Sequence, residues 1–137
     1  MSYRTIKNYI VRILNSLGYN ESEAKFNFDQ ESDLNFDKHF IVTSPSGEIA
    51  DGNTLGTTMY PTRHFRVQIA WQLSESAIAE YDLINQEIDT IITEMHDVSN
   101  FKNDGIKNFQ YKNHQLREEK NYLLAEFNFD ALDSVTF

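Results

Sequence analysis

The chain has 137 residues, a formal net charge of −9 and no cysteine. This length is typical of one domain, and the missing thiols exclude disulfide bonds, thiolate metal sites and cysteine nucleophiles. The negative charge disfavours a dedicated nucleic-acid binder, because phosphate contacts need clustered Lys and Arg. No apolar run approaches the roughly 20 residues that span a bilayer, so we expect no association with a membrane.

The first part of the chain predicts one helix and two strands. Apolar residues spaced three and four apart predict a helix from Tyr3 to Leu17, and Gly18 is placed to form a left-handed C-terminal cap. Alternating apolar residues predict a short strand from Ala24 to Phe28. A dense apolar run predicts a second strand from Lys38 to Thr43.

A long loop is predicted between residues 44 and 58, where the apolar periodicity stops and turn-forming residues dominate. Loops of about 15 residues are unusual inside a compact domain and are often functional. A plain hairpin extension and an interaction loop both fit this pattern. The residues that would make an interface here are Pro45, Ser46, Gly47, Ile49, Asp51, Asn53, Leu55 and Gly56.

A strand followed directly by a helix forms the predicted centre of the core. Phe65, Val67, Ile69 and Trp71 alternate with polar residues within a strand from Met59 to Leu73, which places them on one face of a sheet. Apolar residues at helical spacing then predict a helix from Ser76 to Met95. The two apolar surfaces can pack on each other.

The remaining residues predict two closing strands and a tail. One strand contains Phe109 and Tyr111, a charged turn follows over 113–120, and a last strand runs from Tyr122 to Phe129. The tail from Ala131 to Phe137 has no required structure. The whole chain, 1–137, is therefore expected to be one α+β domain with the order α-β-β-β-α-β-β, in which two helices pack on one face of a mostly antiparallel sheet.

The sequence contains no recognisable catalytic, cofactor-binding or metal-binding motif. Its four histidines lie in different predicted elements, and none has the spacing of a zinc site. Glycine-rich phosphate loops and serine nucleophile elbows are also missing. We therefore expect no enzymatic activity, no cofactor and no metal. A small enzyme that uses scattered residues such as His64, Arg63 and Asp51 is the least favoured interpretation.

The element order resembles the tail terminator, or tail-to-head joining, proteins of long-tailed bacteriophages. The matching parts are the helix from Tyr3 to Leu17, the insertion from Ser44 to Thr58, the strand from Met59 to Leu73 and the helix from Ser76 to Met95. No diagnostic sequence motif accompanies them. The resemblance implies a structural virion protein that is made in the host cytoplasm and incorporated at the tail or neck.

The resemblance also implies the partners. In that family the subunits form a ring, usually a hexamer, which caps the tail tube, stops its polymerisation and joins the tail to head or neck connector proteins. DNA passes through the ring without specific binding, which agrees with an acidic chain. The residue 44–58 loop would contact a neighbouring subunit or the tube protein. The alternative is a cytoplasmic, ferredoxin-like adaptor that binds a protein or ligand.

Overall fold

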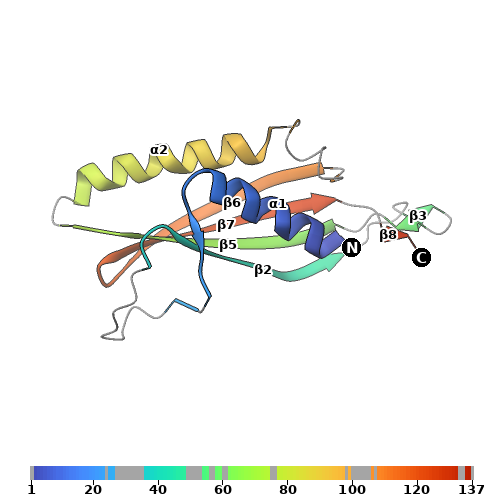
Figure 1. Ribbon diagram of the computed structural model, residues 1–137, viewed down its shortest axis with the longest axis horizontal. Coiled ribbons are helices and arrows are strands. Elements are labelled where there is room, and N and C mark those ends of the chain that lie inside the picture. Colours follow the sequence, from blue (N-terminus) through green and yellow to red (C-terminus); the bar gives the residue numbers. More distant parts are fainter. Residues whose placement is uncertain are drawn as a thin grey trace.

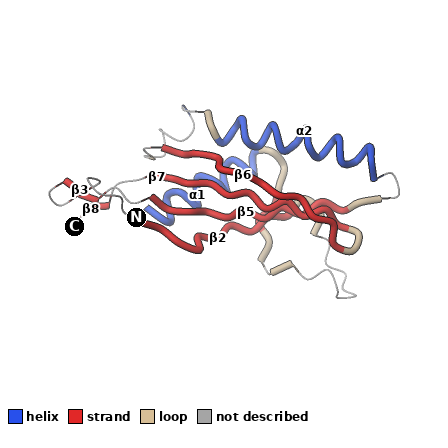
Figure 2. The backbone as a smooth tube through the Cα atoms, turned by 180° about the vertical axis from the view of Figure 1, so that it is seen from behind, coloured by secondary structure: helices blue, strands red, loops and turns tan. Residues whose placement is uncertain are grey.

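The computed structural model describes residues 2–23, 25–26, 36–48, 54–55, 58–59, 62–74, 77–97, 99, 106, 108–132 and 135–136. Two helices lie on one face of a five-stranded sheet, as Figure 1 and the opposite view in Figure 2 show. The helices are α1 (Ser2–Ser16) and α2 (Ala77–Met95). The predicted α+β class, with the order α-β-β-β-α-β-β in the main sheet, is confirmed.

The main sheet has the strand order β1-β2-β5-β7-β6, and only the β1–β2 pair is parallel. Its strands are β1 (Asn20–Glu21), β2 (His39–Glu48), β5 (Thr62–Gln72), β6 (Asn108–Glu119) and β7 (Tyr122–Leu132). A small second sheet joins β3 (Thr54–Leu55), β4 (Thr58–Met59) and β8 (Val135–Thr136). Strand β5 is therefore central, as its apolar alternation indicates.

The core lies between the two helices and the sheet face that they cover. From β5, Phe65, Val67, Ile69 and Trp71 point into it, so the predicted alternation is confirmed. Aromatic side chains of β7 continue this face, and Phe127 stacks on Phe129 at a centroid distance of 6.0 Å. The helices contribute buried residues at helical spacing: Ile6, Tyr9, Ile10, Ile13, Leu14, Ile84, Ile88, Ile91 and Met95.

Hydrogen bonds join the C-terminal end of α2 to α1 and to strand β6. The buried Tyr9 hydroxyl of α1 donates to the Met95 carbonyl of α2 at 2.7 Å, which satisfies an acceptor left free at the helix end. His96 binds strand β6, because its Nε2 accepts from the Tyr111 N–H at 2.8 Å and its Nδ1–H donates to the Ile92 carbonyl at 2.9 Å. At the other end of α2, partial burial and then the Glu118 carboxylate raise the pKa of Tyr81. Helix α2 therefore runs along β6.

Helix α1 ends where the sequence predicts. Gly18 has a φ of +94°, a conformation that glycine adopts without a steric penalty. Its N–H donates to the Asn15 carbonyl, and the next N–H, of Tyr19, donates to the Leu14 carbonyl. This cap turns the chain toward β1.

Two predicted irregular regions are strands instead. Residues 44–48 continue β2 past a bulge between Thr43 and Ser46, and pair with β5 as far as Glu48 and Thr62. The expected turn over 113–120 is wrong, because residues 113–119 belong to β6 and the hairpin turns at Lys120 and Asn121. Lys120 has the positive φ of 55° that a two-residue hairpin turn requires. Polar residues persist in β6 because it is an outer strand with one face free of helices.

The predicted strand from Ala24 to Phe28 is not formed by Lys25 or Phe26, and its other residues lie outside the described part of the chain. Asn20 and Glu21 take its place beside β2. Phe26 instead packs edge-on against Phe36 at a centroid distance of 5.3 Å. The predicted tail without required structure is wrong for its described residues, since residues 131–132 belong to β7 and residues 135–136 form β8.

Candidate functional site

The predicted interface residues fall into different structural settings. Pro45, Ser46 and Gly47 belong to β2, and Leu55 belongs to β3. The other four lie outside the described residues: Ile49, Asp51, Asn53 and Gly56. The structure thus brings Pro45, Ser46 and Gly47 together along one strand. Their role in an interface stays a prediction.

Pro45, Ser46 and Gly47 lie in the part of β2 that forms an outer edge of the sheet. Strand β1 pairs only with His39 and Phe40, and no described strand covers residues 41–48 on that side. The bulge at Pro45 suits an outer edge, because proline cannot donate a ladder hydrogen bond and is confined to edges and bulges. Strand β6 is the opposite edge and pairs, among the described strands, with β7 alone. The sheet therefore ends in two different edges, each able to accept a neighbour.

The sheet face that carries no helix has an apolar cluster at one end, where Phe36 covers Ala70 and Leu124. The rest of this face carries charged side chains, most of which are paired. Arg66 Nε lies 3.1 Å from Glu126 Oε1 across two strands. Asp130 lies between two partners, with Oδ1 at 2.5 Å from His64 Nδ1 and Oδ2 at 3.6 Å from Lys112 Nζ. Because Glu126 and Asp130 each have a basic neighbour, the charges of this part of the face largely compensate each other and do not create a strong field of one sign.

The scattered residues of the enzyme interpretation are described only in part. His64 and Arg63 are consecutive in β5, so their side chains point to opposite faces of the sheet, and Asp51 lies outside the described residues. Ser44 is near His64, but its hydroxyl donates to the main-chain carbonyl of His64 at 3.1 Å rather than to the ring. This geometry does not build the nucleophile–base hydrogen bond of a serine relay.

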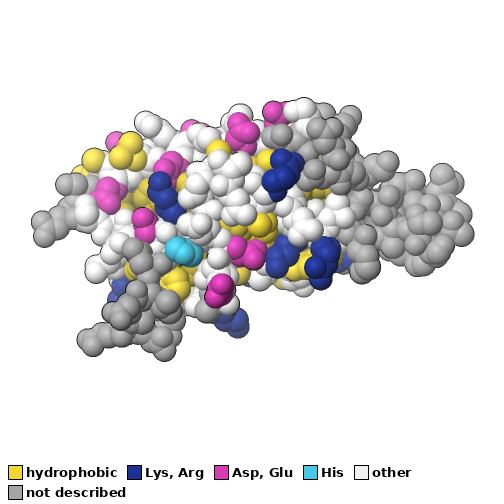
Figure 3. Space-filling model, viewed as in Figure 1, with side chains coloured by type: hydrophobic (Ala, Val, Ile, Leu, Met, Phe, Trp, Pro, Cys, Tyr) yellow, Lys and Arg dark blue, Asp and Glu magenta, His cyan; other side chains and the backbone are white. Residues whose placement is uncertain are grey.

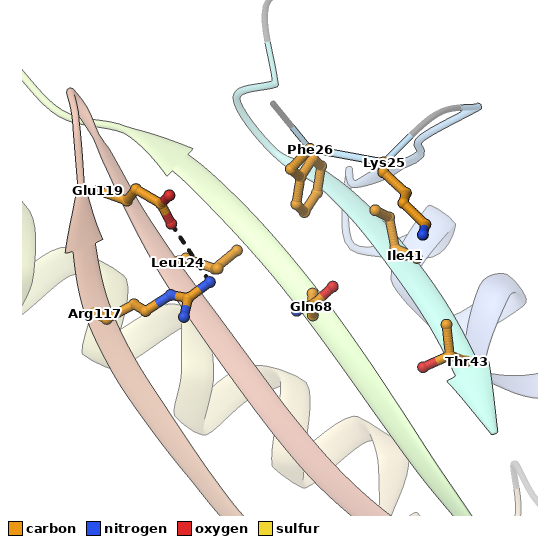
Figure 4. Close-up of a pocket in the computed structure, with 8 residues that line it drawn as sticks. All are labelled: Lys25, Phe26, Ile41, Thr43, Gln68, Arg117, Glu119 and Leu124. Atoms are coloured by element: carbon orange, nitrogen blue, oxygen red, sulfur yellow. Dashed lines mark ion pairs between the residues drawn. The ribbon is translucent and has the colours of Figure 1, made fainter. Parts of the chain in front are cut away.

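A shallow hollow lies at one end of the helix-free face (Figure 4). Its volume is about 260 Å³, below the range of about 300–1,000 Å³ typical of small-molecule sites. Arg117 and Glu119 form an ion pair at 3.4 Å on one side of it, while Phe26 and Lys25 lie on the other. The hollow suits a small polar contact better than an enclosed ligand.

Glu87 of α2 joins three other parts of the chain, although a carboxylate in a helix is ordinarily expected to face solvent. Its Oε2 accepts hydrogen bonds from the Tyr19 hydroxyl at 2.7 Å and from the Trp71 Nε1–H at 2.8 Å, while Lys38 Nζ lies 3.7 Å from Oε1. Burial, and next the bonded carboxylate, raise the pKa of Tyr19 above its usual range. The partners come from three distant segments, so no local sequence signal reveals this cluster.

No group of three or more metal-binding side chains occurs among the described residues. No helix in the described part of the chain is long and apolar enough to cross a membrane. Comparison of the sequence with models of known protein families and with curated proteins found no match in either. The features of the molecule that bear on its function are therefore the fold, its two sheet edges and its surface.

Proposed function

We propose that the protein is a structural component of a bacteriophage virion that forms a ring at the end of the tail tube. In this role the ring, expected to be a hexamer, ends tail polymerisation and joins the tail tube protein to head or neck connector proteins. The observation that carries the proposal is the α-β-β-β-α-β-β order with both helices on one face of the sheet. This is the architecture that the resemblance to tail terminators implies.

The two ends of the sheet support a ring. A cyclic assembly needs a heterologous interface, in which two different patches of each subunit meet. Past the two-residue strand β1, the outer edge of β2 lies at one side of the sheet and β6 lies at the other, and these two edges differ in bulge position. A subunit with two unlike sides can join neighbours head to tail.

The surface charge supports passage of DNA without tight binding. The chain carries a net charge of −9, and cations on the helix-free face are engaged by carboxylates, as in the Arg66–Glu126 pair. The described residues of this face do not form a cluster of free Lys and Arg of the kind that holds phosphates. We therefore place the protein in the virion, at the tail or neck, after synthesis in the host cytoplasm.

Tail-tube growth tests the proposal. The tail tube protein encoded by the same genome is polymerised with and without this chain, and tube lengths are measured by electron microscopy. We expect shorter tubes that no longer grow when more tube protein is added. Tubes of unchanged length that continue to grow, or a genome without a tail tube protein, would overturn the proposal.

A further inference from the structure

The two helices have charges of opposite sign. Helix α1 contains three basic residues (Arg4, Lys7 and Arg12) and no acidic residue. Helix α2 contains five acidic residues and no basic residue: Glu80, Asp82, Glu87, Asp89 and Glu94. Arg4 lies in the first turn of α1 and Glu94 in the last turn of α2, where each charge opposes the helix dipole. Glu80 and Glu87 bind partners within the subunit, so charges that could meet a second copy are to be found among the other residues of the two helices.

The free basic residues of α1 lie on the side that faces away from α2. The Tyr9 hydroxyl binds the Met95 carbonyl, which fixes the side of α1 that faces α2. At about 100° per residue, Arg4 and Lys7 lie roughly 140° and 160° around the helix from Tyr9. Helix α1 also contacts β2. We call Tyr3, Arg4 and Lys7 the basic flank, which lies on the β2 side of the molecule.

The free acidic residues of α2 lie on the opposite side of the molecule. Glu87 binds Tyr19 and Trp71, which fixes the side of α2 that faces the rest of the subunit. Asp82 and Asp89 lie roughly 140° and 160° around the helix from Glu87. Since α2 runs along β6, this side projects beyond the β6 edge. We call Ile78, Asp82 and Asp89 the acidic flank.

Both flanks are accessible, and their charges are unpaired within the described part of the chain. Asp82, Asp89 and Arg4 are exposed and Lys7 is partly so, and none has an ion-pair partner among the described residues. Each flank also has an exposed large apolar side chain, since Ile78 is 84% exposed and Tyr3 is 36% exposed. In Figure 3, acidic side chains gather over α2, and Lys and Arg side chains lie lower, over the first turns of α1.

We propose that the basic flank of one copy docks on the acidic flank of the next copy. Arg4 and Lys7 would pair with Asp82 and Asp89, and Ile78 would pack beside Tyr3. The contact is heterologous, because its two halves lie on opposite sides of the subunit, and it closes into a ring if the rotation between copies is cyclic. This inference rests on the proposed ring and identifies the surfaces that build it.

Charge reversal with complementation tests this interface. Arg4→Glu/Lys7→Glu makes both flanks acidic, and Asp82→Lys/Asp89→Lys makes both flanks basic. We expect each variant alone to need about a tenfold or higher concentration than the wild type to assemble, because attraction becomes repulsion. An equimolar mixture should assemble again, with the two variants alternating. Native mass spectrometry at low ionic strength measures each state, and circular dichroism checks that each variant folds.

Matched controls reverse charges on the central strands β5 and β7, away from both flanks and both edges. Arg66→Glu and Glu126→Lys, which lie on the helix-free face, should assemble like the wild type. Variants that assemble normally, or a mixture that does not regain assembly, would overturn the interface while the ring itself stands. A wild type that remains monomeric at millimolar concentration, also when tail tubes are present, would overturn the proposed function as well.

Discussion

At the scale of single residues, the most connected polar group is the carboxylate of Glu87. It joins the end of α1, the central strand and the turn before β2 through Tyr19, Trp71 and Lys38. Tyr19 and Trp71 also pack edge-on, with ring centroids 5.9 Å apart. A carboxylate that accepts two hydrogen bonds on one oxygen fixes the position of α2 over the sheet, and so fixes where the acidic flank points.

Trp71 should contribute strongly to stability. Its side chain is 3% exposed and donates to Glu87, so we expect Trp71→Ala to lower the free energy of unfolding by about 3–5 kcal/mol. Trp71→Phe keeps an aromatic ring but loses the N–H donor, and should cost about 1–3 kcal/mol. Chemical denaturation measures both values. A near-neutral Trp71→Ala variant would contradict the packing of the central strand.

Glu80 should make stability depend on pH. Its carboxylate accepts from the Ser74 N–H at 2.9 Å and from the Ser74 hydroxyl at 2.6 Å, and these bonds lower the pKa of Glu80 below the ordinary value of 4.5. Because the folded state favours the ionised form, this stabilisation is present above pH 4.5 and is lost as the pH falls through the lowered pKa.

Thermal melting of the wild type and Glu80→Gln at a series of pH values tests this effect. The wild type should melt at a higher temperature near neutral pH, and the difference should disappear in acid. Ser74→Ala removes the hydroxyl donor and should reduce the same difference. A difference that grows as the pH falls would show that the sign is wrong.

At the scale of elements, the spacing of apolar residues was sufficient to predict a helix or strand that has one buried face. Helices α1 and α2 and strand β5 are predicted within a few residues, because their apolar side chains repeat at the helical or strand period. Residues 113–119 escaped prediction because β6 is an outer strand whose polar side chains face solvent or the helix-free face. Residues 44–48 were not predicted as part of a strand, because Ser, Pro and Gly are common both in loops and at edge bulges.

The proposed interface between copies was harder to predict from the sequence than the fold. Charges on α1 and α2 are visible in the sequence, but their placement on opposite sides of the molecule follows from contacts such as Tyr9 with Met95 and Glu87 with Trp71. These contacts join residues far apart in the chain. Periodicity within one helix cannot reveal which side faces a neighbouring element.

Deletion of residues 49–56 tests the role of the segment between β2 and β5. Pairing of these strands extends to Glu48 and Thr62 without it, so we expect the main sheet to fold and ring assembly to be lost. Circular dichroism and native mass spectrometry report on the two properties separately. Unfolding of the deletion variant would mean that the segment is structural, and normal assembly would remove it from the interface.

At the scale of the whole molecule, one helical layer and two unlike sides are what the proposed closed assembly requires of a subunit. The basic flank lies on the β2 side and the acidic flank on the β6 side, so contact between copies would also bring these two sheet edges near each other. Since exposed ion pairs are screened by salt, assembly should weaken as ionic strength rises.

Electron microscopy of the purified chain, alone at low ionic strength and with tail tubes, tests the proposed ring most directly. Class averages should show closed rings of six subunits with a central channel, and the same rings should sit at the ends of tubes. Single subunits in both samples, with bare tube ends, would contradict it.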